Sequence, residues 1–336
     1  MAKRDIFVVG GSAGSTTPLK ELVAGLPGDF PGSLFITTHI PSTHQSYLPE
    51  LLSQIAKIPV RCAVDGQPIE PGQAYVAASD RHLLLIDSTV RLGYGPRENM
   101  SRPAIDPMFR SAALTYGPRA VGVILSGMLD DGASGLFSIK QAGGTAVVQR
   151  PLDAQYDEMP RAALEAVDAD YVASANDLAT LVNEVAGLEA GEPAETPDSL
   201  EFEVEVAAGR RLGSELLRRF SEPTGLTCPG CGGVLSEVHG GKPLRFRCQT
   251  GHAYTAEKLA VHGAAVDEAV RVALRVMEER VDLVQRMARD ARQSGRPAVA
   301  ELYERRTEEY SRYAATLREA AITSLRMSRE ARDESL

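Results

Sequence analysis

An apolar segment that runs into a glycine-rich turn stands near the start of the chain, Asp5-Ile6-Phe7-Val8-Val9-Gly10-Gly11-Ser12-Ala13-Gly14-Ser15. Its valines and isoleucine are typical of a strand that is buried on both faces of a parallel sheet. The glycines allow a sharp turn from strand to helix, and Pro18 suits the first turn of the helix that follows. Ser12 is therefore predicted to lie on a tight turn at the carboxyl end of a strand.

Three interpretations of this turn are open when it is considered alone. A glycine-rich turn after a strand can bind phosphate through its backbone N–H groups. The same turn can be a nucleophile elbow that exposes the Ser12 hydroxyl. The third interpretation is purely structural, because doubly wound folds begin with such a turn.

The composition of the chain is that of an ordinary globular protein. Its 336 residues, 43% hydrophobic and 24% charged, suffice for two domains, and the net charge of −9 argues against a general nucleic-acid binder. No apolar run approaches the roughly 20 residues of a membrane span, and the first strand follows too soon for a signal peptide. We therefore expect a cytoplasmic protein without membrane insertion.

Cys62, alone in an apolar strand, is expected to be buried.

Segments typical of strands and helices alternate from residue 1 to residue 186, the first predicted domain. Strands are expected at 33–38, 60–64, 74–77, 120–126, 145–149 and 171–173, with a hairpin of strands at 82–86 and 90–92. Helices are expected at 47–56, 106–116, 133–141 and 159–166. This alternation predicts an α/β fold with a doubly wound, mostly parallel, Rossmann-like sheet.

The second half of the chain divides into three predicted parts. Residues 187–200 are rich in Gly, Pro, Glu and Ala and predict a linker. Residues 201–256 contain an alternating segment at 201–206, expected to be a half-exposed strand, and a small Cys-rich module. Residues 257–336 predict two amphipathic helices with a break at 294–297, either a helical hairpin or a coiled-coil element through which the chain forms a homodimer.

Three of the four cysteines lie in the Cys-rich module. Cys228 and Cys231 form a CxxC pair, and 16 residues separate this pair from Cys248, which is followed by His252. This spacing is typical of a zinc ribbon in which histidine replaces the fourth cysteine. It predicts a closed, structural zinc site in a reducing compartment. His239 is the rival fourth ligand, and unliganded thiols or a redox CxxC are the alternatives to zinc.

Three predicted strands end at a polar residue, namely Ser12, His39 and Asp131. Open α/β sheets place their sites outside the carboxyl ends of strands, so these side chains are candidates for one site. A hydroxyl, an imidazole that takes its proton and a carboxylate that orients the imidazole are the parts of an acyl-transfer triad. His44 is an alternative base, and Asp130 or Asp131 could instead be a simple helix cap.

The residues around these three positions resemble the protein-glutamate methylesterase (CheB) family of bacterial chemotaxis. Val8–Gly14 is similar to the nucleophile motif of that family, His39-Ile40-Pro41 to its histidine turn and Gly122–Ala133 to its aspartate-bearing block. Arg102–Asp106 and Met159–Ala162 look like two further family segments. The resemblance covers residues 4 to 186, and nothing in the chain resembles the receiver domain that family members usually carry.

The resemblance implies that the chain hydrolyses glutamate methyl esters on chemoreceptors and releases methanol. It also implies deamidation of receptor glutamines by the same acyl chemistry. It selects Ser12 as the nucleophile, His39 as the base and Asp131, rather than Asp130, as the orienting carboxylate. No cofactor is implied for this chemistry, and the expected partners are the methylated cytoplasmic helices of chemoreceptors, with no nucleic acid.

The candidates for the oxyanion hole are backbone N–H groups near Ala13 and Met128, where Gly127 lets the chain approach closely. Two other classes of function stay open. One is a nucleotide-binding module that uses Gly10 to Gly14 for phosphate, although the chain lacks a full GxGxxG and has His39 where such modules carry an acidic residue. The other is a catalytically silent adaptor whose zinc module and helices bind a partner.

Overall fold

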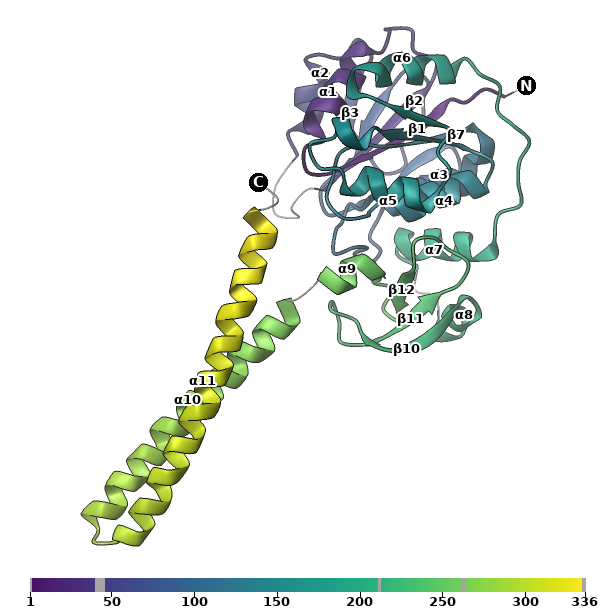
Figure 1. The fold of residues 1–336 in the computed structure, drawn as a ribbon. Helices are drawn as coiled ribbons and strands as arrows, with labels where there is room; N and C mark the ends of the chain where they lie inside the picture. The colour runs from purple at the N-terminus through teal and green to yellow at the C-terminus, as the bar shows by residue number, and fades with distance from the viewer. Residues whose placement is uncertain (1, 40–45, 211–212, 262–263, 334–336) are drawn as a thin grey trace. The chain divides into compact units, whose positions relative to one another are not determined.

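A computed structural model describes residues 2–39, 46–210, 213–261 and 264–333 (Figure 1). The chain divides into two compact units, Met1–Leu259 and Ala260–Leu336. The first unit contains the predicted α/β domain together with the Cys-rich module, and the second contains the two long helices. The α/β domain and the Cys-rich module therefore form one compact unit.

Within the described residues, a sheet of seven parallel strands forms the centre of the first unit. Its spatial order is β3 (Val60–Cys62), β4 (Ala74–Val76), β2 (Ser33–Thr38), β1 (Ile6–Gly11), β7 (Ala120–Ile124), β8 (Thr145–Gln149) and β9 (Tyr171–Ala173). From β1 the chain builds one side of the sheet and then returns to build the other. The predicted doubly wound fold is confirmed, and its topological switch point lies between β1 and β7.

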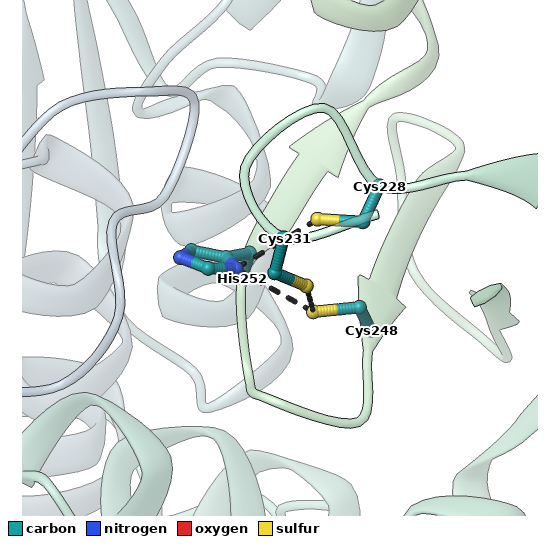
Figure 2. Close-up of side chains that lie close together, drawn as sticks. All are labelled: Cys228, Cys231, Cys248 and His252. Atoms are coloured by element: carbon teal, nitrogen blue, oxygen red, sulfur yellow. Dashed lines mark hydrogen bonds between the residues drawn. The ribbon is translucent and has the colours of Figure 1, made fainter. Parts of the chain in front are cut away.

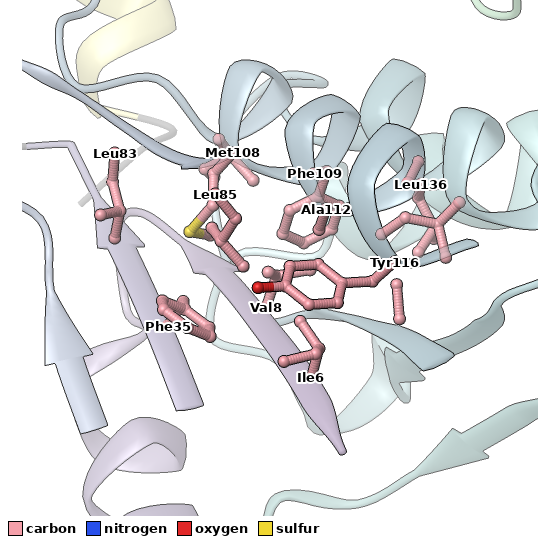
Figure 3. Close-up of a cluster of buried hydrophobic side chains, with 14 of the residues drawn as sticks. Ile6, Val8, Phe35, Leu83, Leu85, Met108, Phe109, Ala112, Tyr116 and Leu136 are labelled. Carbon is pink, nitrogen blue, oxygen red and sulfur yellow. The ribbon is translucent and has the colours of Figure 1, made fainter. Parts of the chain in front are cut away.

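Helices cover both faces of this sheet (Figure 1). On one face lie α3 (Ile105–Tyr116), α4 (Ala133–Gln141) and α5 (Glu158–Ala166), and on the other lie α1 (Thr16–Gly25) and α6 (Ala175–Ala186). Successive side chains of β1 point to opposite faces, as in any strand. Ile6 and Val8 therefore pack against α3 in one core, whereas Phe7 and Val9 belong to the other (Figure 3).

Smaller elements lie at the margin of the α/β domain. The predicted hairpin is present, with β5 (His82–Ile86) antiparallel to β6 (Thr89–Gly93), and α2 (Leu48–Ser53) precedes the edge strand β3. The predicted burial of Cys62 is wrong, since its side chain is exposed. The physical reason is that β3 pairs on one side only, at the edge of the sheet, so that its outer residues meet solvent.

The strand predicted at 201–206 is also wrong, because this segment is part of the helix α7 (Asp198–Ala208). Apolar residues alternate with glutamates because the helix is packed on two sides. Leu200 joins the core between the main sheet and α3, while Phe202 and Val206 pack against Leu217 of α8 (Ser214–Phe220). The predicted linker therefore ends at residue 197 and not at 200.

Within the described chain, the Cys-rich module is a sheet of four antiparallel strands followed by the short helix α9 (Ala256–Val261). Its strands are β10 (Ser221–Thr227), β11 (Val234–Val238), β12 (Arg245–Cys248) and β13 (Ala253–Thr255). The predicted strand that leads to Cys248 is thus present as β12.

The second unit is a helical hairpin of α10 (Ala264–Gln293) and α11 (Pro297–Asp333), with the predicted break between them. The side chains of Ala288, Ala291 and Ala300 are buried, which fits close packing of the two helices. None of the described helices combines the length and the apolar character that crossing a bilayer requires.

Candidate active site and metal centre

Ser12, His39 and Asp131 meet at the carboxyl edge of the main sheet, beside its switch point. Ser12 follows β1, His39 follows β2, and Asp131 lies in the loop between β7 and α4. His39 Nδ1 lies 2.9 Å from Ser12 Oγ, and His39 Nε2 lies 2.7 Å from Asp131 Oδ2. The tautomer that is protonated at Nε2 donates to Asp131 and leaves Nδ1 to accept the hydroxyl proton. His44, the alternative base, lies outside the described residues.

The turn that carries Ser12 is fixed by backbone hydrogen bonds. The Ser12 N–H donates to the Ser126 carbonyl at 2.9 Å, and the Ser15 hydroxyl donates to the Ser12 carbonyl at 2.6 Å. Gly14 has a φ of +70°, which favours glycine, and a Cβ there would lie 2.7 Å from Ser126 Oγ. The glycine-rich turn therefore holds the serine against the loop that follows β7.

Among the described residues, four groups donate hydrogen bonds to the Asp131 carboxylate, which is 3% exposed. Oδ2 accepts from His39 and, at 2.8 Å, from the Ile105 N–H at the start of α3. Oδ1 accepts from the Asp106 N–H and from Asn99 Nδ2, both at 3.3 Å. Asn99 could not be identified from the sequence as a support of the site, because it belongs to no motif.

The charge of this site is concentrated on Asp131. Burial raises the pKa of Asp131, but the hydrogen bond and charge of His39 outweigh burial and hold the pKa at about 2. The neighbouring Asp106 differs, since burial and the negative charge of Asp131 raise its pKa well above the ordinary value. The buried negative charge of Asp131 faces the imidazole and would stabilise its protonated form.

Asp130 lies beside Asp131 in the sequence but has a different partner. Its carboxylate accepts a hydrogen bond from Thr255 Oγ1 in the Cys-rich module at 2.7 Å. Burial raises the pKa of Asp130 to about 6. Of the two adjacent aspartates, it is thus Asp131 that reaches the imidazole, and the catalytic roles predicted from the sequence stay predictions.

The predicted oxyanion donors lie in two well-fixed turns. Neither the Ala13 nor the Met128 N–H donates a hydrogen bond to another described residue. Next to Met128, the Gly127 N–H donates to the Tyr156 carbonyl at 3.0 Å. A Cβ at Gly127 would overlap Met159 and lie 3.0 Å from the Ser12 Cβ, which shows how closely this turn approaches the serine. The role of these N–H groups remains a prediction.

The four predicted metal ligands also come together, as Figure 2 shows. Cys231 Sγ lies 3.6 Å from Cys248 Sγ, and His252 Nδ1 lies 3.7 Å from Cys228 Sγ and 3.6 Å from Cys248 Sγ. A tetrahedral zinc ion with Zn–S bonds of about 2.3 Å and a Zn–N bond of about 2.0 Å needs ligand separations of roughly 3.5 to 3.8 Å. These three separations fit zinc, and all four donor atoms lie within 4.8 Å of one another. His239, the rival ligand, is not part of this group.

A buried ion cluster joins the Cys-rich module to the α/β domain, and its members are Glu98, Arg110, Glu203, Arg245 and Arg247. Arg110 of α3 pairs with Glu98 and with Glu203 of α7. Arg247 and Arg245 of β12 lie 2.9 Å from Glu98 and 2.7 Å from Glu203, respectively. Burial raises the pKa of Glu203, but the arginines outweigh it and lower the pKa to about 2.

A doubly wound sheet with a serine, a histidine and a carboxylate hydrogen-bonded in series at its carboxyl edge is the arrangement of serine hydrolases. Residues 7–182 match the family model of the CheB methylesterase. The chain belongs to this family, as the motifs predicted. The Thermotoga maritima CheB methylesterase catalytic domain has a similar structure, with a TM-score of 0.52 and 31% identity. The likeness covers 55% of this chain and 99% of that domain.

Curated relatives resemble the same part of the chain. A Geobacter metallireducens protein named protein-glutamate methylesterase/protein-glutamine glutaminase 1 is 40% identical over 172 residues, which cover 50% of this chain and 47% of the relative. A Thiobacillus denitrificans relative named in the same way is 38% identical, and 49% of it is covered. The chain spans about half the length of these two. A provisionally named Leptospira interrogans relative is 39% identical and is covered over 92% of its length.

Proposed function

We propose that this chain demethylates glutamate methyl esters on chemoreceptors, and deamidates glutamines there, as a serine hydrolase of bacterial chemotaxis. The pair of hydrogen bonds from Ser12 through His39 to Asp131 carries the proposal. The family membership and the names of the relatives support the choice of substrate. The methylated cytoplasmic helices of a chemoreceptor would be the partner, and the cytoplasm the place of the reaction.

The first half of the reaction would form an acyl-enzyme. Ser12 Oγ attacks the ester carbonyl while His39 Nδ1 takes the hydroxyl proton, which leaves a tetrahedral oxyanion. The Ala13 and Met128 N–H groups donate to that oxygen, a contribution typically worth about 10²- to 10³-fold in rate for one donor. The C–O bond to the methoxy group then breaks, and His39 returns the proton so that methanol leaves.

The second half would free the serine. His39 accepts a proton from water, the hydroxide attacks the acyl carbonyl, and the new tetrahedral species expels Ser12 Oγ, which takes the proton back. A glutamate remains on the receptor. In both halves Asp131 keeps the imidazole oriented and stabilises its charged form. A glutamine substrate follows the same course with ammonia as the leaving group.

Methanol release from a methylated receptor tests this function. Ser12→Ala removes the nucleophile and is expected to lower the rate at least 10³-fold while the thermal unfolding midpoint stays near that of the wild type. Ser53→Ala, on the exposed face of α2, is the matched control and is expected to be fully active. Undiminished turnover by Ser12→Ala would show that the nucleophile lies elsewhere.

We also propose a structural zinc ion bound by Cys228, Cys231, Cys248 and His252. The ligand separations near 3.6 Å support a closed tetrahedral site, in which zinc would stabilise the module without taking part in the ester chemistry. Protein produced with zinc should contain one ion per chain, and Cys228→Ser should lose it. Cys62→Ser, which alters an exposed cysteine outside the cluster, should keep it. Wild-type protein free of zinc under these conditions would refute the site.

For the helical hairpin we propose association with a second copy of the chain. The support is a set of apolar side chains that remain exposed on this unit, among them Leu283 at 57% and Tyr313 at 49%. Light scattering should give twice the chain mass, and Leu283→Glu should lower it toward that of a monomer. A monomeric wild type at high concentration would exclude this arrangement.

A further inference from the structure

We propose that Thr255 and Asn99 are positioning residues through which the Cys-rich module holds the Asp131 carboxylate of the active site. The proposal deepens the hydrolase function proposed above and rests on it. Asn99 lies within the family match at residues 7–182, whereas Thr255 and the rest of the Cys-rich module lie beyond it. The module would thus be a support of the active site and not merely an appendage.

The Asp131 carboxylate is held by hydrogen-bond donors from nearby parts of the chain. Apart from His39, every described donor to this carboxylate comes from one short segment, residues 99–106. Asn99 donates through its side chain, and Ile105 and Asp106 donate through their backbone. The position of Asp131 relative to the imidazole therefore depends on where this segment lies.

The start of that segment is held by the Cys-rich module. The Asn99 N–H donates to the Ala253 carbonyl at 2.9 Å, and Glu98 forms an isolated parallel β-bridge with Ala253 of β13. Met100 packs against the apolar core of the module. Asn99 and Met100 both have a left-handed backbone, with φ of 48° and 65°. Such a conformation is costly for methionine and persists only where surrounding contacts fix it.

Thr255 donates two hydrogen bonds to this region. Its N–H donates to Asn99 Oδ1 at 3.0 Å, and the other end of the same amide, Nδ2, donates to Asp131 Oδ1 at 3.3 Å. Its hydroxyl donates to Asp130 Oδ1 at 2.7 Å. Thr255 is 1% exposed. Thr255 therefore holds both adjacent aspartates, Asp130 through a direct hydrogen bond and Asp131 through the side chain of Asn99.

These hydrogen bonds also connect the candidate metal site to the candidate active site. His252, a ligand of the candidate metal site, immediately precedes β13, whose last residue is Thr255. Arg247 secures the same region, since it donates to the Gly251 carbonyl at 2.8 Å and pairs with Glu98. Metal binding that fixes the turn at residues 248–252 would therefore also fix residues 99–106, which support Asp131.

Kinetics of the full-length protein test the link. Thr255→Val keeps the shape but loses the hydroxyl, and Thr255→Ser keeps the hydroxyl. Asn99→Gly removes the amide and suits the left-handed backbone. We expect Asn99→Gly to lower kcat for methanol release about 10- to 100-fold, because the side-chain hydrogen bond to the buried Asp131 carboxylate is lost. Thr255→Val keeps the backbone N–H that donates to Asn99 but loses the hydrogen bond that fixes Asp130, the residue before Asp131, and should lower kcat about 10-fold. In both variants KM should stay within about twofold of the wild type. Thr255→Ser should restore most of kcat.

A spectroscopic readout separates positioning from simple stability. The proton shared by His39 Nε2 and Asp131 should give a downfield signal in the NMR spectrum of the folded protein. The signal should shift or broaden in Thr255→Val and Asn99→Gly but not in Thr255→Ser, at temperatures where all of them remain folded. An unchanged signal together with kcat within twofold of the wild type in both Thr255→Val and Asn99→Gly would overturn the proposal. A wild type that shows the signal but releases no methanol would refute the proposed function alone.

Discussion

Replacing Glu203 by glutamine should remove a large part of the stability that joins the Cys-rich module to the α/β domain. The Glu203 carboxylate lies 2.9 Å from Arg110 Nε and 2.7 Å from Arg245 Nη1, and it is 2% exposed. Without its charge, the buried Arg110 and Arg247 would share only Glu98, and the partly buried Arg245 would lose its ion-pair partner. Breaking a buried ion pair in this way costs about 3 to 5 kcal/mol.

The shift in the pKa of Glu203 gives the same order of magnitude. A fall from the ordinary value of 4.5 to about 2 corresponds to about 3 kcal/mol in favour of the folded, ionised state. Because the folded-state pKa is the lower one, this stabilisation is complete above pH 4.5 and is lost as the pH falls through about 2. The wild type should therefore exceed Glu203→Gln by about 3 kcal/mol at pH 7 and by only about 1 kcal/mol at pH 3.

Urea unfolding of the full-length protein, followed by tyrosine fluorescence, measures this difference. Glu205→Gln is a matched control on the same helix, since its partner Arg210 is mostly exposed and such a pair contributes at most about 1 kcal/mol. If Glu203→Gln costs no more than Glu205→Gln at pH 7, the ion cluster does not secure the module and the reasoning is refuted.

Three further predictions follow from the site. Asp130→Asn should stabilise the fold by up to about 3 kcal/mol at pH 8, because burial raises the pKa of Asp130 from 3.8 to about 6. In urea titrations this gain should vanish as the pH falls from about 6 to about 4. Gly127→Ala should lower kcat at least about 10-fold and cost about 1 to 3 kcal/mol in thermal unfolding, because its Cβ would overlap Met159 beside Ser12; a fully active variant would contradict the packing. Removal of zinc by a chelator should lower kcat about 10-fold or more and equimolar zinc should restore it; chelated, zinc-free protein with full activity would show that the metal does not support the site.

The sheet and the cluster of Ser12, His39 and Asp131 could be predicted because their signals are local. Strands buried on both faces are continuous apolar runs, and a parallel sheet brings the residues at their carboxyl ends to one edge. The four metal ligands were predictable for the same reason, since two short turns carry them all.

The parts that the sequence did not predict depend on distant partners. Glu203 lies in a segment whose apolar residues alternate as in a strand, yet the segment is a helix. The burial of Glu203 on that helix depends on arginines of α3 and β12 that neutralise its charge. Arg247 and Glu98 pair across 149 positions of the chain, and neither belongs to a motif. Asn99 supports Asp131 only because β13 fixes its loop. No periodicity or spacing in the sequence carries such information.

If Ser12 is the nucleophile of an ester hydrolase, its acyl-enzyme intermediate can be trapped. A receptor peptide that carries a glutamate methyl ester would be mixed with the full-length protein, quenched in acid within the first turnover and examined by mass spectrometry. We predict a covalent ester between the peptide's glutamyl group and Ser12, lighter than the sum of enzyme and substrate by one methanol. Methanol release without this adduct, or with the adduct on another residue, would show that Ser12 is not the nucleophile.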